Sequence, residues 1–362
     1  ERSSRFLIVP GGSLRGRLRV PGDKSISHRA IMLGALAEGQ TRVSGFLEGE
    51  DSLATLAAFR SMGVGIQGPV AGNLIIDGLG LRGLKEPAGP LDLGNSGTSM
   101  RLLCGLLAGQ GFSVTLAGDA SLTRRPMRRV TEPLARMGAD IETSPSGTAP
   151  LRIRPVATLQ GIDYAMPVAS AQVKSCVLLA GLFALGRTCV SEPAPTRDHT
   201  ERMLAGFGYQ VRRQGATVCL EGGGRLLGRE LTVPADISSA AFFMVGASIA
   251  PGSDLTLEHV GINPTRLGVL NILKAMGADI EILNPRDAGG EPVADLRVRS
   301  APLHGIRIPE DQVPLAIDEF PAIFIAAACA KGETLLTGAE ELRVKESDRI
   351  QVMADGLSAL GI

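Results

Sequence analysis

Three apolar helical stretches of the sequence each follow a short polar segment that carries hydroxyl side chains and a cation. The segments are PGDKSISHRA (21–30), GNSGTSMR (94–101) and ASAQVKS (169–175). Their cations are Lys24, Arg29, Arg101 and Lys174. A cation in a first turn opposes the helix dipole, whereas an anion bound there is stabilised by the dipole and by free N–H groups. The pattern therefore predicts anion binding at three helix starts. Plain capping by Asp23, Ser96 and Ser170 is the alternative for any one of them.

Carboxylates and further arginines form a second group of candidates. Asp318 stands directly before an apolar stretch, where it either caps a helix or does chemistry, and Glu346 lies in the charged run RVKESDR (343–349). An ordinary capping box around Ser347 with solvated charges is the alternative for that run. Two arginine-containing stretches, SLTRRPMRRV (121–130) and PTRDHT (195–200), add cations, of which Arg128 and Arg129 are expected at the surface. No metal site is predicted, because the four histidines are isolated and show no ligand spacing.

Composition narrows the class of protein. The 362 residues suggest two or three domains, and the 37 basic residues balance 37 acidic ones, so no net charge favours nucleic acid or acidic membranes. Trp is absent and Tyr occurs twice, which argues against base-stacking surfaces. The five cysteines lack ligand spacing and are expected to be reduced core residues of a cytosolic protein. No apolar run reaches the roughly 18 residues of a membrane span. The start lacks a signal peptide and a Met, which indicates a trimmed or internal chain.

The chain repeats one pattern five times. Five apolar stretches predict buried helices: 30–39, 102–111, 177–186, 241–252 and 322–332. Strand-like segments follow them: TRVSG, FSVTLAG, TCVSE, SDLTLEHV and ETLLTG. Amphipathic helices come next and end at glycine C-caps: Gly63, Gly138, Gly208, Gly277 and Gly361. Copies one to three predict a first domain over 23–232. Residues 1–22, with a strand over 5–20, and 233–362 predict an incomplete second domain, because copy five stops at Ile362 before its closing strand.

The motifs resemble one enzyme family over nearly the whole chain. They are PGDKSISHRA, LDLGNSGTSMR, GDASLTRRPM, SAQVKS, PTRDHTE, NPTR, AIDEFP and EELRVKESDR, in order from Pro21 to Arg349. They resemble the 5-enolpyruvylshikimate-3-phosphate (EPSP) synthase family. The resemblance implies an α/β fold of two domains, an inverse α/β barrel (alpha-beta prism). Its six βαβαββ units have helices inside and sheets outside and close over a cleft. Five of the six units are expected here, with the C-terminus missing.

The resemblance also implies a reaction and its residues. The enolpyruvyl group of phosphoenolpyruvate moves to the 5-hydroxyl of shikimate-3-phosphate, phosphate leaves, and no cofactor or metal takes part. Residues implied for shikimate-3-phosphate are Lys24, Ser25, Arg29, Ser170, Ala171, Gln172, Arg197, Asp318 and Lys345. Those implied for phosphoenolpyruvate and its competitor glyphosate are Lys24, Asn95, Gly97, Thr98, Arg125, Gln172 and Arg349. Both partners are small molecules. The resemblance implies a cytoplasmic monomer that binds neither nucleic acid nor membrane.

Roles in an addition–elimination mechanism follow from the same resemblance. Asp318, with Lys24 nearby, would take the proton of the 5-hydroxyl. Glu346, with Lys345, would deliver a proton to the methylene carbon, and the tetrahedral intermediate would then lose phosphate. The family carries a further Arg and a late Lys beyond the equivalent of Ile362. A chain that ends there is expected to bind poorly and to turn over little or nothing.

Two alternatives and one specific expectation complete the hypothesis. The sister family acts on UDP-N-acetylglucosamine, but it has KN in place of KS and a reactive Cys, and residues 112–130 contain none. A non-catalytic anion-binding scaffold, or an inactive truncated fragment, is the other alternative. Some glyphosate-tolerant members of the family resemble this chain in their other motifs but carry Ala at the position equivalent to Gly97. Because this chain has Gly there, the resemblance implies a glyphosate-sensitive enzyme.

Overall fold

The computed structural model describes residues 6–362 and divides into two compact units. One unit contains residues 21–236 together with 287–292, and the other contains residues up to 20, 237–286 and 293–362. The short stretch 287–292 was expected in the second domain and belongs instead with the larger unit. Within residues 6–362, no helix is both long enough and apolar enough to cross a membrane. The strand predicted over 5–20 forms only over Arg15–Leu18, and its first residue lies outside the described chain.

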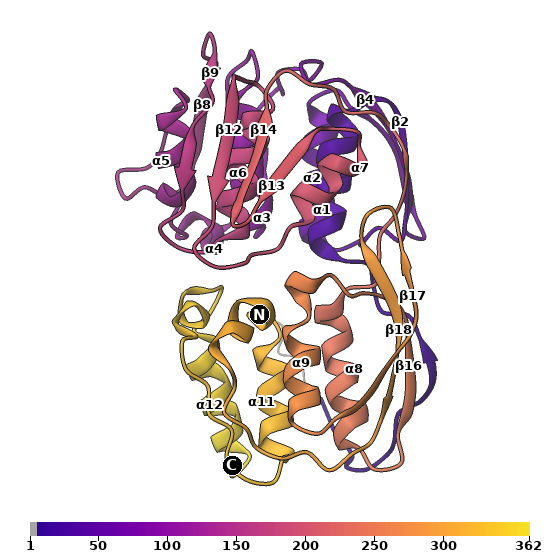
Figure 1. Ribbon diagram of the computed structural model, residues 1–362. Helices are drawn as coiled ribbons and strands as arrows, with labels where there is room; N and C mark the ends of the chain where they lie inside the picture. Colours follow the sequence, from indigo (N-terminus) through magenta and orange to yellow (C-terminus); the bar gives the residue numbers. More distant parts are fainter. Residues whose placement is uncertain (1–5) are drawn as a thin grey trace. The chain divides into compact units, whose positions relative to one another are not determined.

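Helices and strands alternate along the larger unit (Figure 1). Its helices are α1 (Lys24–Leu36), α2 (Glu50–Ser61), α3 (Gly97–Ala108), α4 (Ala120–Thr123), α5 (Arg128–Arg136), α6 (Ala171–Gly181) and α7 (His199–Gly206). Its strands are β2 (Glu38–Ser44), β3 (Gly65–Val70), β4 (Asn73–Leu79), β5 (Leu91–Asp92), β6 (Val114–Ala117), β7 (Asp140–Glu142), β8 (Leu151–Arg154), β9 (Leu159–Gln160), β10 (Asp163–Ala165), β11 (Ala184–Leu185), β12 (Arg187–Ser191), β13 (Val211–Gln214), β14 (Thr217–Glu221) and β15 (Glu230–Thr232).

The smaller unit repeats these elements. Its strands are β1 (Arg15–Leu18), β16 (Asp254–Gly261), β17 (Asp279–Asp287) and β18 (Pro292–Arg299). Its α-helices are α8 (Ile237–Ile249), α9 (Gly268–Ala275), α10 (Val313–Ala316), α11 (Phe320–Cys329) and α12 (Arg349–Ala359). Its short 3₁₀ turns are η1 (Pro264–Arg266), η2 (Glu310–Gln312) and η3 (Glu340–Val344).

Four four-stranded sheets share one topology. Their strand orders are β15-β2-β4-β3, β5-β6-β8-β7, β10-β12-β14-β13 and β1-β16-β18-β17. In the second sheet, β5 and β6 are parallel and joined through α3, whereas β8 pairs antiparallel with both β6 and β7. The third sheet repeats this with α6 between its parallel strands. A parallel pair needs a crossover, and the buried helices supply it. These are the predicted βαβαββ units, and the predicted α/β fold class is confirmed.

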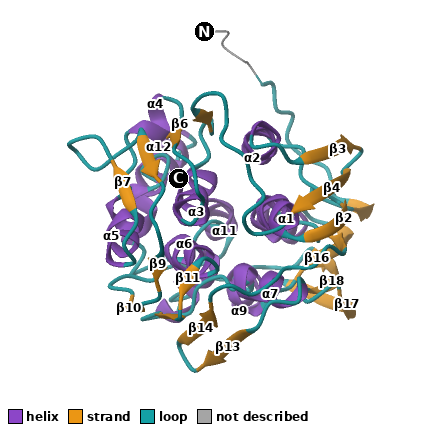
Figure 2. Ribbon diagram, turned by 90° about the horizontal axis from the view of Figure 1, so that it is seen from above, coloured by secondary structure: helices purple, strands orange, loops and turns teal. Residues whose placement is uncertain are grey.

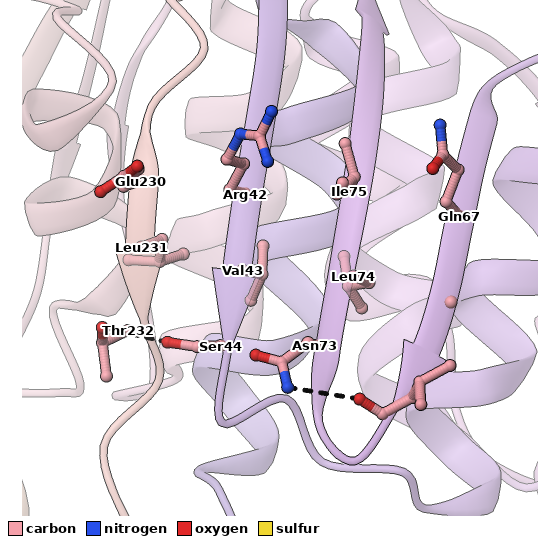
Figure 3. Close-up of a pocket in the computed structure, with 12 residues that line it drawn as sticks. Arg42, Val43, Ser44, Gln67, Asn73, Leu74, Ile75, Glu230, Leu231 and Thr232 are labelled. Carbon is pink, nitrogen blue, oxygen red and sulfur yellow. Dashed lines mark hydrogen bonds between the residues drawn. The ribbon is translucent and has the colours of Figure 1, made fainter.

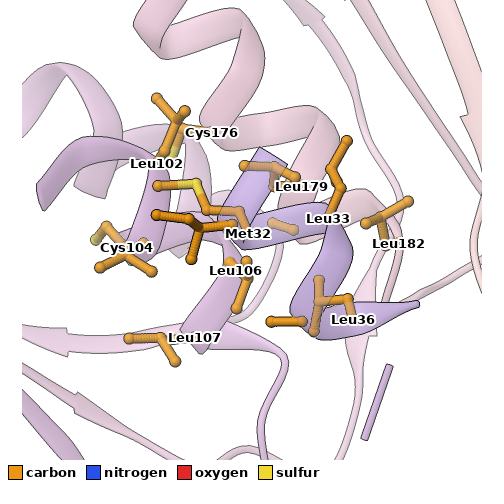
Figure 4. Packing of buried hydrophobic residues seen from close by; sticks show 14 of the residues in the cluster. Met32, Leu33, Leu36, Leu102, Cys104, Leu106, Leu107, Cys176, Leu179 and Leu182 are labelled. Carbon is orange, nitrogen blue, oxygen red and sulfur yellow. The ribbon is translucent and has the colours of Figure 1, made fainter. Parts of the chain in front are cut away.

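The apolar helices form the inside of the larger unit. Figure 2 shows its strands at the periphery and α1, α3 and α6 inside. Figure 4 shows leucines of these three helices, including Leu33, Leu106 and Leu179, packed against one another. Helices α3 and α6 approach closely at Gly105, where a Cβ would lie 2.1 Å from the Cys176 carbonyl oxygen. Apolar residues all round each helix follow from this complete enclosure.

The predicted glycine C-caps are confirmed. The five glycines that end the amphipathic helices have φ between 82° and 98°, a backbone conformation that only glycine adopts without strain. The predicted strand of copy five, ETLLTG, does not form. Within this segment Leu335 makes an isolated bridge with Arg307, and Lys331, two residues before the segment, makes another with His304. In the other copies an antiparallel hairpin after the amphipathic helix stabilises this strand, and none follows α12 among residues 6–362.

The expectation of five reduced cysteines is wrong for one pair. Cys189 and Cys219 form a disulfide, with their Cα atoms 4.1 Å apart. They face each other on antiparallel strands β12 and β14, and this register brings their side chains together. Cys104, Cys176 and Cys329 are free thiols. Burial raises the pKa of Cys104 to about 12, as expected for an inert core thiol.

Candidate functional site

The structure shows N-caps at all three helix starts of the larger unit, which the sequence offered as the alternative to anion binding. Asp23 accepts a hydrogen bond from the Ile26 N–H at 2.8 Å, which begins α1. Ser96 accepts from Ser99 at 3.1 Å and begins α3. Ser170 accepts from Val173 at 3.3 Å and begins α6. Each cap satisfies one of the first-turn donors, so capping and a role in anion binding are compatible at the same helix start.

Polar side chains of three segments converge at the start of α3. The Gln172 amide donates to Thr98 Oγ1 at 3.1 Å and accepts from Arg101 Nη1 at 2.5 Å. Arg125, in the turn between α4 and α5, donates through Nη2 to Asn95. The structure thus places Asn95, Thr98, Arg125 and Gln172, all predicted for phosphoenolpyruvate, around the start of α3, whereas Lys24 lies at the start of α1. Arg101 also donates through Nη2 to the Pro126 carbonyl oxygen at 3.4 Å.

Gly97 lies next to the guanidinium groups of Arg101 and Arg125. A Cβ at this position would lie 2.9 Å from Arg125 Nη1 and 3.3 Å from Arg101 Nη1. The first distance is shorter than a normal contact. The backbone of α3 can therefore approach the two cations only because residue 97 lacks a side chain.

Residues predicted for shikimate-3-phosphate lie at the starts of α1 and α6. Lys24 is about half exposed, with side-chain exposure of 48%, and forms an ion pair with Asp51 of α2. Arg29 is buried and donates to Thr200 Oγ1 at 2.7 Å, to Ser175 Oγ at 2.8 Å and to the Ser25 carbonyl oxygen at 3.0 Å. Burial lowers the pKa of Arg29 to about 10, so it remains charged at neutral pH.

Arg197 lies in the loop between β12 and α7, half-buried. Its charge is close enough to contribute to the lowered pKa of Arg29, after the larger effect of burial. Ala171 and Gln172 form the first turn of α6 after the Ser170 cap. Arg128 is exposed, as expected, whereas Arg129 is half-buried.

Lys174 does not lie where the sequence pattern predicted. Its side chain is completely buried and contacts Glu192 Oε2 at 2.9 Å and Glu201 Oε1 at 2.8 Å. A buried ammonium group with two carboxylate partners is a structural ion cluster, because no position remains at which a substrate anion could reach it. The sequence pattern could not distinguish Lys174 from Arg101, since Glu192 and Glu201, the two partners of Lys174, come from other segments of the chain.

The remaining predicted residues lie in the smaller unit. Arg349, in the first turn of α12, donates to Asp318 Oδ1 at 3.1 Å and to Glu346 Oε2 at 2.7 Å. Burial disfavours its charge, but the two carboxylates outweigh burial and raise the pKa of Arg349. Lys345 Nζ lies 3.8 Å from Glu341 Oε1. One guanidinium thus holds both predicted acid–base carboxylates in place.

Sequence reasoning missed a polar network next to Asp318. Glu319 is buried and accepts a hydrogen bond from Ser238, and Arg266 donates to Ser238 Oγ at 2.6 Å. Arg266 belongs to the NPTR motif, to which no role was assigned. Asp51, the partner of Lys24, was also missed, because an acidic first turn is ordinary at a helix start.

A buried histidine links α1 to the start of α3. His28 Nδ1 lies 2.8 Å from Thr55 Oγ1, which lies 2.6 Å from Ser99 Oγ. Among the described residues, no group hydrogen-bonds to its buried Nε2 atom. Burial, with a smaller contribution from the charge of Lys24, lowers the pKa of His28 to about 3. The folded protein therefore holds this imidazole neutral.

This histidine predicts a loss of stability in acid. The unfolded chain protonates His28 below about pH 6.5, whereas the folded chain does so only near pH 3. The unfolded state thus binds more protons between these values, and stability falls with pH by up to about 1.4 kcal/mol per unit. Urea unfolding between pH 4 and 7 should show a shallower pH dependence for His28→Gln than for the wild type. His304→Gln, at an exposed histidine, is the control, and equal slopes for all three proteins would contradict the prediction.

One hollow of the larger unit lies away from the predicted site residues. It is a depression of about 440 Å³ on the sheet β15-β2-β4-β3, and Figure 3 shows side chains that line it, among them Arg42, Gln67 and Glu230. None of the predicted site residues lines it. Among residues 6–362, no cluster of three or more His, Cys, Asp or Glu side chains is arranged to hold a metal ion.

Comparisons with known proteins identify the family of this chain. The family described as EPSP synthase (3-phosphoshikimate 1-carboxyvinyltransferase) matches residues 8–362. The chain belongs to the EPSP synthase family. A 3-phosphoshikimate 1-carboxyvinyltransferase from Alkalilimnicola ehrlichii is 74% identical over 99% of this chain and 80% of its own length. A protein of the same name from Methylococcus capsulatus is 73% identical over 99% of this chain and 82% of its own length.

Solved structures agree. An EPSP synthase from Acinetobacter baumannii matches with a TM-score of 0.89 and 62% identity, covering 96% of this chain and 79% of that one. The chain is therefore a transferase of the shikimate pathway. It transfers the enolpyruvyl group of phosphoenolpyruvate to the 5-hydroxyl of shikimate-3-phosphate and releases phosphate. These names decide against both the UDP-N-acetylglucosamine enzyme and the non-catalytic scaffold.

Proposed function

We propose that the residues at the helix starts of the larger unit bind the two substrate anions. Phosphoenolpyruvate contacts the cluster at the start of α3, which comprises Asn95, Gly97, Thr98, Arg125 and Gln172. The observation that carries this proposal is the convergence of Arg101 and Arg125 on Gly97, where a Cβ would be 3.3 Å and 2.9 Å from their Nη1 atoms. Two guanidinium groups beside a helix N-terminus are a strong anion site.

Shikimate-3-phosphate contacts the starts of α1 and α6. The residues are Lys24, Ser25, Arg29, Ser170, Ala171, Gln172 and Arg197 of the larger unit, with Asp318 and Lys345 of the smaller one. The three hydrogen bonds of Arg29 support a fixed guanidinium that orients polar substrate groups. The half-exposed ammonium of Lys24 supports direct contact with a ligand and is proposed to serve both substrates.

Acid–base chemistry belongs to the carboxylates held by Arg349, which is also proposed to contact phosphoenolpyruvate. Asp318 takes the proton of the 5-hydroxyl while the oxygen bonds to C2 of phosphoenolpyruvate. Glu346 delivers a proton to the methylene carbon C3, which becomes a methyl group. The tetrahedral intermediate then loses one methyl proton and phosphate, and the C2–C3 double bond forms again. The shared contacts of Arg349, at 3.1 Å and 2.7 Å, support a fixed spacing of the two carboxylates.

A phosphate-release assay with both substrates tests the anion-site assignments. We expect Arg125→Ala to raise the KM for phosphoenolpyruvate about tenfold or more, because a charged hydrogen bond contributes roughly 1.5–3 kcal/mol. Arg128→Ala, three residues away at the surface, should leave the KM unchanged. Equal kinetics of the two variants would remove Arg125 from the site. Turnover with UDP-N-acetylglucosamine in place of shikimate-3-phosphate would contradict the substrate assignment as a whole.

The proposal also covers the domain boundaries, the cellular location, the oligomeric state and the absence of macromolecular partners. The folding domains are 23–232 and 1–22 with 233–362, except that the stretch 287–292 groups with the first domain. The enzyme acts as a cytoplasmic monomer without nucleic acid or membrane partners. The equal numbers of basic and acidic residues, 37 of each, support the absence of a polyanionic partner.

A further inference from the structure

Lys174 is a buried charge that the proposed chemistry does not use. Its Nζ donates to Glu192 Oε2 at 2.9 Å and lies 2.8 Å from Glu201 Oε1, and its side chain is 0% exposed. Glu192 follows β12, and Glu201 lies in the first turn of α7. Lys174 thus joins three segments of the larger unit that are separate in sequence.

The same cluster holds the backbone of Thr196, the residue directly before Arg197. The Thr196 carbonyl oxygen accepts from Lys174 Nζ at 3.4 Å. Its N–H donates to Glu192 Oε2 at 3.3 Å, and its hydroxyl donates to the same oxygen at 2.7 Å. Because both polar groups of the Thr196 backbone are held, the direction in which the chain enters Arg197 is fixed.

The other end of the cluster is the start of α6. Lys174 lies one turn after the Ser170 cap, and its own N–H donates to the Ser170 carbonyl oxygen at 3.0 Å. A helical turn is rigid on this scale. A bond from Lys174 to Thr196 therefore relates the position of Arg197 to that of the residues 170–172.

The cluster is balanced in charge. Arg213 of β13 donates to Glu192 Oε1 at 2.6 Å and lies 3.6 Å from Glu201 Oε1, so two cations meet two carboxylates. Burial alone would raise the pKa of Glu192, but the Thr196 hydroxyl and the Lys174 ammonium outweigh it and lower that pKa. Such a cluster contributes geometry more than stability, because its desolvation offsets most of the attraction.

We propose that Lys174 is a positioning residue for shikimate-3-phosphate. It holds the segment 192–197 against the start of α6, so that Arg197 and residues 170–172 address the same substrate molecule. This role rests on the proposed function, which assigns those residues to shikimate-3-phosphate. Lys174 itself does not contact the substrate.

Lys174→Met tests the role, because methionine keeps the length of the side chain and removes the ammonium. We expect the KM for shikimate-3-phosphate to rise about tenfold or more, since small displacements of positioning groups are costly. The kcat and the KM for phosphoenolpyruvate should change much less. Leu116→Ala, in the core of β6 and fully buried, is the control for lost stability and should leave the KM for shikimate-3-phosphate unchanged.

Two further variants separate a folding defect and a wrong substrate assignment from the positioning role of Lys174. If Lys174→Met does not fold, Lys174→Met with Glu192→Gln removes one unpaired carboxylate and should fold with the same raised KM. Arg197→Ala tests the assignment of Arg197 to shikimate-3-phosphate, on which the positioning role of Lys174 rests. A raised KM for Arg197→Ala with an unchanged KM for the Lys174 variant overturns the positioning role and leaves the assignment intact. An unchanged KM for Arg197→Ala overturns the assignment, and the positioning role with it.

Discussion

Glu346→Gln is expected to lower kcat by about 10²–10⁴-fold, the usual contribution of one general acid–base group. The glutamine amide oxygen can still accept the hydrogen bond that Glu346 Oε2 accepts from Arg349 at 2.7 Å. The side chain should therefore stay in place while it loses the ability to transfer a proton. Binding of both substrates should change little, so the loss appears in kcat with KM values near those of the wild type.

The control uses the same substitution a few residues earlier. Glu340 is exposed at the start of η3 and has no proposed role, so Glu340→Gln should keep the full kcat. Phosphate release under saturating substrates measures all three proteins. A kcat for Glu346→Gln within twofold of the wild type would show that another group delivers the proton, and the assignment would fail. Asp318 is held by the same arginine at 3.1 Å and would then be the next carboxylate to test.

Local features of this chain could be predicted from sequence, because their causes are local. The caps at Asp23, Ser96 and Ser170 each bond to an N–H three residues later. The same holds for the glycine C-caps, which need only a positive φ. A pattern repeated five times then reveals a repeated unit of buried helix, strand, amphipathic helix and strand, whereas its description as a βαβαββ unit came from the family resemblance.

Partners distant in sequence could not be predicted. Lys174 and Arg101 occupy similar positions at helix starts, yet one is buried against Glu192 and Glu201 and the other reaches Gln172. The Cys189–Cys219 pair depends on the register of two strands, which a spacing of 30 residues does not reveal. Such contacts are set by tertiary packing.

Gly97→Ala is expected to separate binding of phosphoenolpyruvate from binding of glyphosate. The new methyl group would lie 2.9 Å from Arg125 Nη1 and 3.3 Å from Arg101 Nη1, so the guanidinium of Arg125 must move. The helix itself should tolerate alanine, because the contacted atoms are the ends of flexible side chains. One extra methyl group in a binding pocket changes binding by roughly 1–3 kcal/mol. We therefore expect the inhibition constant of glyphosate to rise about 10- to 200-fold, with a smaller rise in the KM for phosphoenolpyruvate.

The smaller effect on the substrate has a physical reason. Phosphoenolpyruvate gains further stabilisation as charge develops during reaction, whereas an inhibitor that occupies its site gains only the ground-state contacts that the displaced guanidinium weakens. Gly111→Ala is the matched control, because a Cβ there would meet nothing within 4 Å. Inhibition of phosphate release by glyphosate, measured for wild type, Gly97→Ala and Gly111→Ala, gives the three constants. Equal inhibition of wild type and Gly97→Ala would exclude Gly97 from the inhibitor's surroundings and, with it, the proposed site for phosphoenolpyruvate at the start of α3.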